Sequence, residues 1–404
     1  MKLLFVSNLF PSSVEPDRGL FNLQLLKAIR AAGHDVQVIA PVFRPVPTAW
    51  LKRLPLPRRH EQIGEIPVMH PVFRYPPGLF RRQHHLFYRQ AVKPAFSGML
   101  RQFEPDHVIL GFAYPDAAAM APICQRAGVR HSVRINGSDF RLRTEDPKLR
   151  TLVLKTLREA GLVFCPGKTL KNEMVAAGVP AQSIVSFNNG VDHAQFTPGQ
   201  AKKLEEDDVT VLFVGHLKRV KGADLLIRAW AALRKPTAYR QPESQSLTLN
   251  VVGSGPLRRR LERLAAELGV SDSIRFAGNV LHEDVAQIMR DSRCLVLPSR
   301  SEGMPNVVLE ALACGIPVVA TDVGEVPYLV REGVNGYVVH KSQELAPIEE
   351  PEIIINLAQK IGEVIARPWD REDIAATVKD FTWERAAQTV IAAIEEKADT
   401  EPRE

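Results

Sequence analysis

The stretch CLVLPSRSEGMPNVVLEALACGIPVVATDVG, residues 294–324, decides the fold of this chain. It begins with a fully apolar run, Cys294–Leu297, which predicts a buried strand. A polar loop follows, and Pro305 then stands where the first turn of a helix tolerates a missing N–H group. Gly315 and Pro317 end that helix before a second apolar run begins. A strand, a helix and a strand in this order form the building block of a parallel α/β sheet.

The same alternation of strands and helices covers most of the chain. Short apolar runs alternate with helical spacings of Leu and Ala from Lys2 to Phe187, with one interruption over residues 44–101. The alternation restarts at Val209, after a polar stretch that has the composition of an interdomain linker. The sequence therefore predicts an α/β protein with two Rossmann-like, doubly wound domains: residues 1–196, a linker over 197–208, residues 209–366, and C-terminal helices over 367–404.

The composition agrees with a globular protein of two domains. The chain has 404 residues, of which 45% are hydrophobic and 24% charged, and these proportions exclude disorder over most of its length. The four cysteines form no CxxC pair, which argues against a disulfide framework or a structural zinc site. No run reaches the roughly 18 apolar residues of a membrane span, and the N-terminus has no signal-peptide pattern. We expect a cytoplasmic protein, one that can sit on the inner face of a membrane.

The positive charge is concentrated in one segment. Residues 44–101 hold eleven Lys or Arg and two acidic residues, a local balance of +9, whereas the whole chain carries +6. Aromatic residues and prolines accompany these charges, a composition that suits an anionic membrane surface or a phosphorylated, lipid-linked substrate. A solvated, arginine-rich loop region explains the same composition equally well. No base-reading motif is present, so we expect no nucleic-acid partner.

Two carboxylates lie close together in the stretch that decides the fold. Glu302 falls in the loop after the strand, and Glu310 falls about one turn into the following helix. A carboxylate accepts two hydrogen bonds from vicinal hydroxyls, as of a ribose or a hexose. The backbone amides of residues 303–306 lie at the helix N-terminus, where they favour a phosphate or polarise a sugar hydroxyl. Taken alone, Glu310 is equally explained as a solvated helix residue.

Basic side chains follow the first strand of the second domain. In VTVLFVGHLKRVKGADLL, residues 209–226, the strand ends before Gly215, and His216, Arg219 and Lys221 follow in the loop. Basic groups in the first loop of such a domain are placed to neutralise a diphosphate, although solvated loop residues are the ordinary alternative. A third turn, Val252–Pro256, contains Gly253 but lacks the rest of a dinucleotide fingerprint, so it does not support NAD binding.

Together these motifs resemble those of the retaining glycosyltransferases of family 4, which have the GT-B fold. The resemblance covers nearly the whole chain and is strongest over residues 209–325. It rests on the following elements: Glu302 to Glu310 with the intervening GMPNVVL, Gly215 with Lys221-Gly222, the VGSGP turn, NGVD at 189–192, FTWE at 381–384, GHDV at 33–36, and GSD at 137–139.

The resemblance implies two Rossmann-like domains that face a cleft, with a C-terminal helix that crosses back to the first domain. It implies sugar transfer with retention and without a metal, helped by basic residues and helix dipoles, and no cofactor beyond the UDP- or GDP-sugar co-substrate. Lys221 would contact the donor diphosphate and help the leaving group depart. Glu302 would bind hydroxyls of the transferred sugar, and Glu310 would bind those of the ribose.

The resemblance also assigns backbone contacts and partners. The amides from Gly303 to Asn306 would hold the sugar and the distal phosphate, and the backbone near Val280 would line the base. The N–H groups of this stretch belong to Gly303, Met304 and Asn306, because Pro305 has none. The acceptor would be a sugar or a lipid-linked sugar bound by the first domain, as in the synthesis of a bacterial surface polysaccharide or glycolipid.

Two positions depart from the family pattern. His216 stands where the family has an arginine, and Arg219 or Lys218 would supply the missing charge, although a histidine does not replace an arginine fork. Asn136 stands where the family has a histidine; it can donate a hydrogen bond but cannot carry a proton, which is compatible with a leaving phosphate that deprotonates the acceptor. Two alternatives stay open. One is a sugar-nucleotide epimerase or phosphorylase of the same fold, and the other is a non-catalytic nucleotide-sugar-binding subunit, which these two departures favour.

Overall fold

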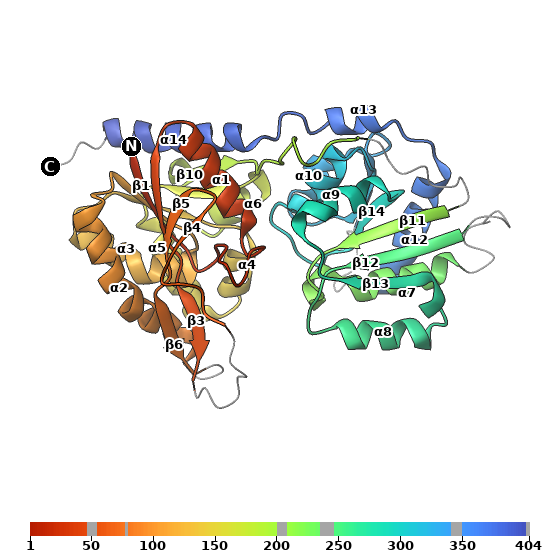
Figure 1. Cartoon of the computed structure of the whole chain (residues 1–404), viewed down its shortest axis with the longest axis horizontal. Coiled ribbons are helices and arrows are strands. Elements are labelled where there is room, and N and C mark those ends of the chain that lie inside the picture. The colour runs from red at the N-terminus through yellow and green to blue at the C-terminus, as the bar shows by residue number, and fades with distance from the viewer. Residues whose placement is uncertain (47–54, 77–79, 200–207, 235–245, 341–349, 401–404) are drawn as a thin grey trace. The chain divides into compact units, whose positions relative to one another are not determined.

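The computed structural model describes residues 1–46, 55–76, 80–199, 208–234, 246–340 and 350–400. The chain forms two compact units (Figure 1). The first unit consists of residues 1–190 together with 383–404, and the second consists of residues 191–382. Each unit has its own sheet of mostly or wholly parallel strands, so the predicted α/β class is confirmed.

The first unit is built on an eight-stranded sheet in the order β10-β9-β8-β7-β1-β2-β5-β4. Its strands are β1 (Lys2–Val6), β2 (Asp35–Ile39), β4 (His60–Ile63), β5 (Ile66–Met69), β7 (His107–Leu110), β8 (His131–Arg134), β9 (Val163–Pro166) and β10 (Ile184–Phe187). All neighbours run parallel except β4, which pairs antiparallel with β5. A separate two-stranded sheet pairs β3 (Val42–Pro45) with β6 (Val72–Tyr75).

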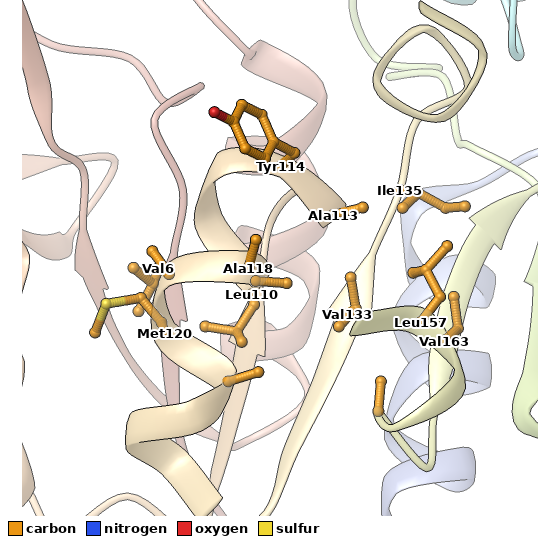
Figure 2. Close-up of a cluster of buried hydrophobic side chains, with 14 of the residues drawn as sticks. Val6, Leu110, Ala113, Tyr114, Ala118, Met120, Val133, Ile135, Leu157 and Val163 are labelled. Carbon is orange, nitrogen blue, oxygen red and sulfur yellow. The ribbon is translucent and has the colours of Figure 1, made fainter. Parts of the chain in front are cut away.

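The helices of the first unit pack on both faces of this sheet. They are α1 (Leu20–Ala31), α2 (His84–Gln102), α3 (Ala118–Arg126), α4 (Ser138–Thr144), α5 (Pro147–Arg158), α6 (Lys168–Ala176) and α14 (Trp383–Thr400). The central strands are continuous apolar runs because both faces are covered. On one face, Leu110, Val133 and Val163 form a cluster with Met120 of α3 and Leu157 of α5 (Figure 2).

The C-terminal helix α14 covers part of the other face. Trp383, Val390 and Ile394 are buried in one cluster with Phe5 of β1 and Ile29 of α1. These side chains are spaced for one face of a helix, so the helix buries a continuous apolar stripe. The predicted return of the C-terminal helix to the first domain is therefore confirmed.

The basic segment over residues 44–101 is mostly folded, and the interpretation as a loop region is wrong for it. It contains β4, β5, β6 and most of α2. Three of its aromatic residues, Phe73, Tyr88 and Phe96, are at most 2% exposed, so they belong to the core and not to a surface that meets a membrane. Residues 47–54 and 77–79, with Trp50 among them, lie outside the described residues.

The second unit is built on a six-stranded, fully parallel sheet in the order β13-β12-β11-β14-β15-β16. Its strands are β11 (Asp208–Val214), β12 (Ser246–Val252), β13 (Ile274–Gly278), β14 (Cys294–Leu297), β15 (Val318–Thr321) and β16 (Gly336–Val339). Its helices are α7 (Ala223–Leu233), α8 (Arg258–Glu267), α9 (His282–Arg290), α10 (Asn306–Ala313), α11 (Val326–Leu329), α12 (Glu350–Ala366) and α13 (Arg371–Ala376). Within the described ranges, no helix is long and apolar enough to cross a membrane.

The structure divides the chain at other residues than the sequence predicts. Residues 191–196 and 367–382 belong to the second unit, whereas the sequence predicts them in the first domain and in the C-terminal helices. The reason is tertiary burial: Val191 and Phe196 join the second unit's core together with Ile374 of α13. Of the predicted linker over 197–208, residues 200–207 lie outside the described residues.

Candidate functional site

The candidate site of the second unit lies where its parallel strands end. Parallel strands bring their carboxyl ends to one edge of the sheet, so the loops after β11, β12, β13 and β14 meet there. The Gly215 N–H donates to the Val252 carbonyl at 3.0 Å, and the Gly253 N–H donates to the Gly278 carbonyl at 2.7 Å. Three of the predicted site loops are thus joined through their backbones.

Two glycines allow these loops to approach one another. Gly253 has a φ of +129°, and a Cβ atom there would collide with the Gly215 carbonyl. Gly222 has a φ of +69°, and a Cβ atom there would collide with the Pro298 carbonyl, just beyond β14. Only glycine adopts such conformations without strain. The loop that carries Lys221 is therefore pressed against the loop that carries Glu302.

Lys221 and Glu302 form an ion pair across this contact. The Lys221 Nζ lies 2.7 Å from the Glu302 Oε1, and the Ser299 hydroxyl donates to the same oxygen at 2.6 Å. The Glu302 side chain is 10% exposed and that of Lys221 27%, so the pair is shielded but reachable. The structure brings together the two residues to which the sequence assigns the diphosphate and the transferred sugar.

The loop of Glu302 is held on both sides. Arg300 donates through both terminal nitrogens to the Asp224 carboxylate, at 2.8 and 2.7 Å, and its Nη1 also donates to the Arg219 carbonyl at 2.8 Å. On the other side, the Glu325 N–H donates to the Gly303 carbonyl at 2.9 Å. A bidentate arginine–carboxylate pair fixes geometry as well as charge.

The N-terminus of α10 follows this loop directly. Pro305 takes the cap position in an extended conformation, Asn306 is the first helical residue, and no side chain caps the helix. Met304 is 8% exposed and packs in the core beneath. An uncapped helix N-terminus presents backbone N–H groups and a partial positive charge to an anion. The predicted amide cradle, Gly303 to Asn306, thus lies between the ion pair and α10.

Glu310 faces a histidine that the sequence analysis did not name. The His282 Nε2 lies 3.5 Å from the Glu310 Oε1, and the Gln195 side-chain amide donates to the His282 carbonyl at 2.7 Å. His282 begins α9, two residues after Val280, which packs on the core below. The rule that loops after parallel strands share one edge could have found His282, because it follows β13.

Two of the basic residues that precede Lys221, His216 and Arg219, occupy different surroundings. The side chain of His216 is largely exposed. The part of it that is buried lowers its pKa, and the positive charge of Lys218 lowers the pKa further. The side chain of Arg219 lines a cavity together with Arg228 and Arg260, and no other predicted site residue lines that cavity. This placement argues against Arg219 as the substitute for the arginine that His216 replaces.

Asn136 lies in the first unit, at the carboxyl end of β8. Its backbone N–H donates to the Asp139 Oδ1 at 2.9 Å, and the Ala113 N–H lies 3.4 Å from the other oxygen. Burial raises the pKa of Asp139 to about 6. The Asn136 Nδ2 is buried and has no hydrogen-bond partner within the described part of the chain. It is a donor available to a ligand.

A second buried carboxyl, which the sequence analysis did not name, lies at the same edge of the first sheet. Asp116 is fully buried, and its Oδ2 lies 3.3 Å from the Asn8 N–H. Burial raises the pKa of Asp116 to about 8, and the Asn8 N–H, which donates to its Oδ2, opposes that rise. Asp116 is therefore mostly protonated at neutral pH.

Comparison with known proteins gives the family of the chain. Residues 20–195 match the family described as Glycosyltransferase Family 4, and residues 197–349 match the one described as Glycosyl transferases group 1. The chain belongs to glycosyltransferase family 4. This family 4 protein resembles HepE of Anabaena, whose structure contains UDP-glucose, with a TM-score of 0.67 at 20% identity over 98% of this chain and 100% of that one. The likeness confirms the GT-B fold.

Two curated relatives of this family 4 protein differ in how much they share with it. The putative teichuronic acid biosynthesis glycosyltransferase TuaC of Bacillus subtilis is 28% identical over 395 residues, 94% of both chains. The D-inositol 3-phosphate glycosyltransferase of Actinosynnema mirum is 33% identical over 241 residues, 55% of this chain. The chain matches 54% of the length of that enzyme. In the described residues of this family 4 protein, no group of three or more His, Cys, Asp or Glu could hold a metal ion.

Proposed function

We propose that this protein is a retaining glycosyltransferase that moves a sugar from a UDP- or GDP-sugar to an acceptor, without a metal. The Lys221–Glu302 ion pair beside the N-terminus of α10 carries this proposal. A cation, a carboxylate and uncapped backbone amides at one edge are complementary to a sugar joined to a diphosphate. Retention rests on the family resemblance alone, and the anomeric proton of the product, observed by NMR, tests it.

Donor binding in this scheme replaces the ion pair by two new contacts. The Lys221 ammonium turns from Glu302 to the diphosphate, and Glu302 accepts hydrogen bonds from the hydroxyls of the sugar. Charge builds up on the leaving diphosphate as the glycosidic bond breaks. Lys221 and the dipole of α10 stabilise that charge more in the transition state than in the bound donor, which is the condition for catalysis. The diphosphate itself takes the acceptor proton.

The remaining donor contacts follow from the neighbouring loops. Glu310 accepts hydrogen bonds from the ribose, and His282 at 3.5 Å orients its carboxylate. The backbone near Val280 lines the base. The UDP-glucose bound to HepE supports a nucleotide-sugar donor of this kind. The Asn136 Nδ2 of the first unit is the free donor for a hydroxyl of the reacting sugars.

The acceptor is a sugar or a lipid-linked sugar of bacterial surface polysaccharide or glycolipid synthesis, and the name of the TuaC relative supports this class. We also propose that the protein works in the cytoplasm, against the inner face of the membrane. Exposed Phe80 and Leu86 lie in the same segment as exposed Arg58 and Arg59, which suits an anionic lipid surface. Replacement of both arginines by glutamate weakens binding to anionic vesicles if this proposal is correct; unchanged binding contradicts it.

Donor binding is tested first by thermal unfolding with UDP, GDP, ADP and their sugar conjugates. A ligand at about 100 times its Kd adds roughly 2.7 kcal/mol to the stability of the native state. We expect one nucleotide family to raise the Tm, and the shift to disappear in Lys221→Ala. Lys379→Ala is the matched control, because it removes an exposed lysine of the same unit. An equal shift in both variants contradicts the role of Lys221.

A turnover assay separates this function from its alternatives. Donor consumption with formation of a glycoside supports the transferase, and treatment with EDTA leaves the rate unchanged if no metal takes part. Release of an epimerised free sugar supports the epimerase. If the protein binds a donor but shows neither sugar transfer nor slow hydrolysis of the donor, the result supports the binding subunit. The departures at His216 and Asn136 favour this alternative.

A further inference from the structure

The second unit has a cavity of about 630 Å³ between α7 and α8, apart from the candidate donor site. In Figure 1, α8 lies at the outer edge of the unit, next to α7. Lys221, Glu302 and Glu310 do not line this cavity. Its volume falls within the range of small-molecule sites, roughly 300–1,000 Å³.

Four arginines line the cavity. Arg219 precedes α7, Arg228 lies on α7, and Arg260 and Arg263 lie on α8. All four residues are exposed, and among the described residues none of them forms an ion pair. Like charges one turn apart on a helix, as at Arg260 and Arg263, repel one another. Nothing in the folding of α8 requires this accumulation of charge.

The acidic residues of the cavity do not neutralise these arginines. Asp224 already forms an ion pair with Arg300 at 2.7 Å, so Glu267 is the one other acidic residue among those that line the cavity. The floor is apolar: Leu261 is 1% exposed, and Leu257 and Leu264 pack beside it. Arginine forks match the geometry of phosphate and carboxylate groups, and an apolar floor suits the carbon skeleton of a ligand.

We propose that this cavity is a second binding site, which takes a small molecule with two or more phosphate or carboxylate groups. Four arginines exceed what one monoanion can neutralise. The concave shape with a leucine floor favours a small molecule over a flat lipid surface. The proposal does not depend on glycosyl transfer, since none of the groups assigned to the donor line the cavity except Arg219.

The site is connected to the loops of the candidate donor site. Arg219 belongs to the same short 3-10 turn as Lys221, and Arg300 binds both the Arg219 carbonyl and Asp224. Arg300 in turn lies two residues before Glu302. A polyanion in the cavity lowers the positive potential of these loops, so it weakens binding of a nucleotide diphosphate. By linkage, the nucleotide weakens binding of the polyanion by the same factor.

Calorimetric titration with fructose 1,6-bisphosphate tests the site, because this probe carries two phosphates on a hexose. We expect binding by the full chain and by Lys221→Ala, and a Kd about tenfold weaker in the double variant Arg260→Gln/Arg263→Gln. The control is Arg331→Gln, an exposed arginine of the same unit outside the cavity. The far-UV spectrum and the Tm of each variant show whether it folds.

Three outcomes would overturn the proposal. Equal binding by the double variant and by Arg331→Gln means that the probe binds the surface non-specifically. Loss of binding in Lys221→Ala means that the probe occupies the donor site. Failure of the probe to bind, while the double variant loses affinity for vesicles of anionic phospholipid, means that α8 faces a membrane. A Kd for UDP that rises with the concentration of bisphosphate, and that does not rise in the double variant, would support the coupling.

Discussion

Lys221 and Glu302 neutralise one another in this structure, and we propose a separate role for each once a donor is bound. An ion pair of this exposure contributes about 1 kcal/mol in isolation, since solvent screens it. The larger consequence is preorganisation, because the pair holds both side chains at the edge where the donor is proposed to bind. Stability and donor binding should therefore respond differently to the same substitution.

A double-mutant cycle measures that difference. We expect Lys221→Ala, Glu302→Gln and the double variant to change the free energy of unfolding by about 1 kcal/mol or less, with a coupling that falls as salt is added. Donor affinity should fall by at least about tenfold in each single variant. Loss of stability in proportion to loss of donor affinity would mean that the pair is only structural.

Asp116 makes the stability of the first unit depend on pH. Burial raises its pKa from the ordinary 3.8 to about 8, so between about pH 4 and pH 8 the folded state holds a proton that the unfolded state has released. Each pKa unit corresponds to about 1.4 kcal/mol. Stability is therefore lost as the pH rises through this window and is fully present below it.

Asp116→Asn tests this assignment. We expect the difference between the Tm of the variant and the Tm of the wild-type protein to rise from pH 5 to pH 8.5, because asparagine has no proton to lose. Asp139, whose pKa is about 6, titrates in both proteins, and its charge helps to raise the pKa of Asp116, so the difference between the curves reports the coupled pair. Asp35→Asn, an exposed carboxylate of β2, is the control and should follow the wild-type curve. Parallel curves for Asp116→Asn would contradict the raised pKa.

At the scale of elements, the loops after the strands depend on glycines that have no room for a side chain. Gly253 and Gly269 both have positive φ values, +129° and +70°, but only Gly253 faces a backbone carbonyl; nothing lies within 4 Å of a Cβ atom at Gly269. We expect Gly269→Ala to cost about 1 kcal/mol and Gly253→Ala to cost more and to abolish nucleotide binding. Equal effects on stability and nucleotide binding would show that close approach to Gly215 is unimportant.

The elements that the sequence predicted are those whose signals are local. The run over residues 294–324 contains its own strand, cap and stop residues, and the structure begins β14 and α10 where the sequence placed them. The helix α2 escaped prediction because its apolar stripe, with Tyr88, Val92 and Phe96 among its members, is diluted by arginines and histidines and contains Pro94. Its burial depends on β6, which is distant from most of it in sequence.

The candidate site was predictable to the same extent. Lys221 and Glu302 come together because both follow parallel strands, and that rule needs no coordinates. Asp116 was not predictable as a buried group, since its environment is assembled from Asn8, Tyr88 and other residues distant in sequence. The boundary at residue 190 depended likewise on a distant segment, since the Val191 N–H donates to the Phe381 carbonyl at 3.0 Å.

At the scale of the whole molecule, the chain leaves the first unit at residue 190 and returns to it at residue 383. The stability of the first unit therefore depends on the last helix of the chain. Trp383 is 7% exposed in the first unit, and Trp230 is fully buried in the second, where its Nε1 donates to the Ser273 hydroxyl at 3.0 Å. These two tryptophans report on separate cores.

Calorimetry of two variants, each of which lacks one of these tryptophans, tests whether the two cores unfold separately. Trp383→Ala should lower the free energy of unfolding of the first unit by about 3–5 kcal/mol, the usual cost of removing a buried tryptophan. It should leave nucleotide binding by the second unit intact. Trp230→Ala should lower the other transition and weaken nucleotide binding, because α7 follows Lys221 directly. A single transition that both variants lower equally would mean that the two cores unfold as one cooperative body, and the division of the chain at residues 190 and 383 would then have no thermodynamic counterpart.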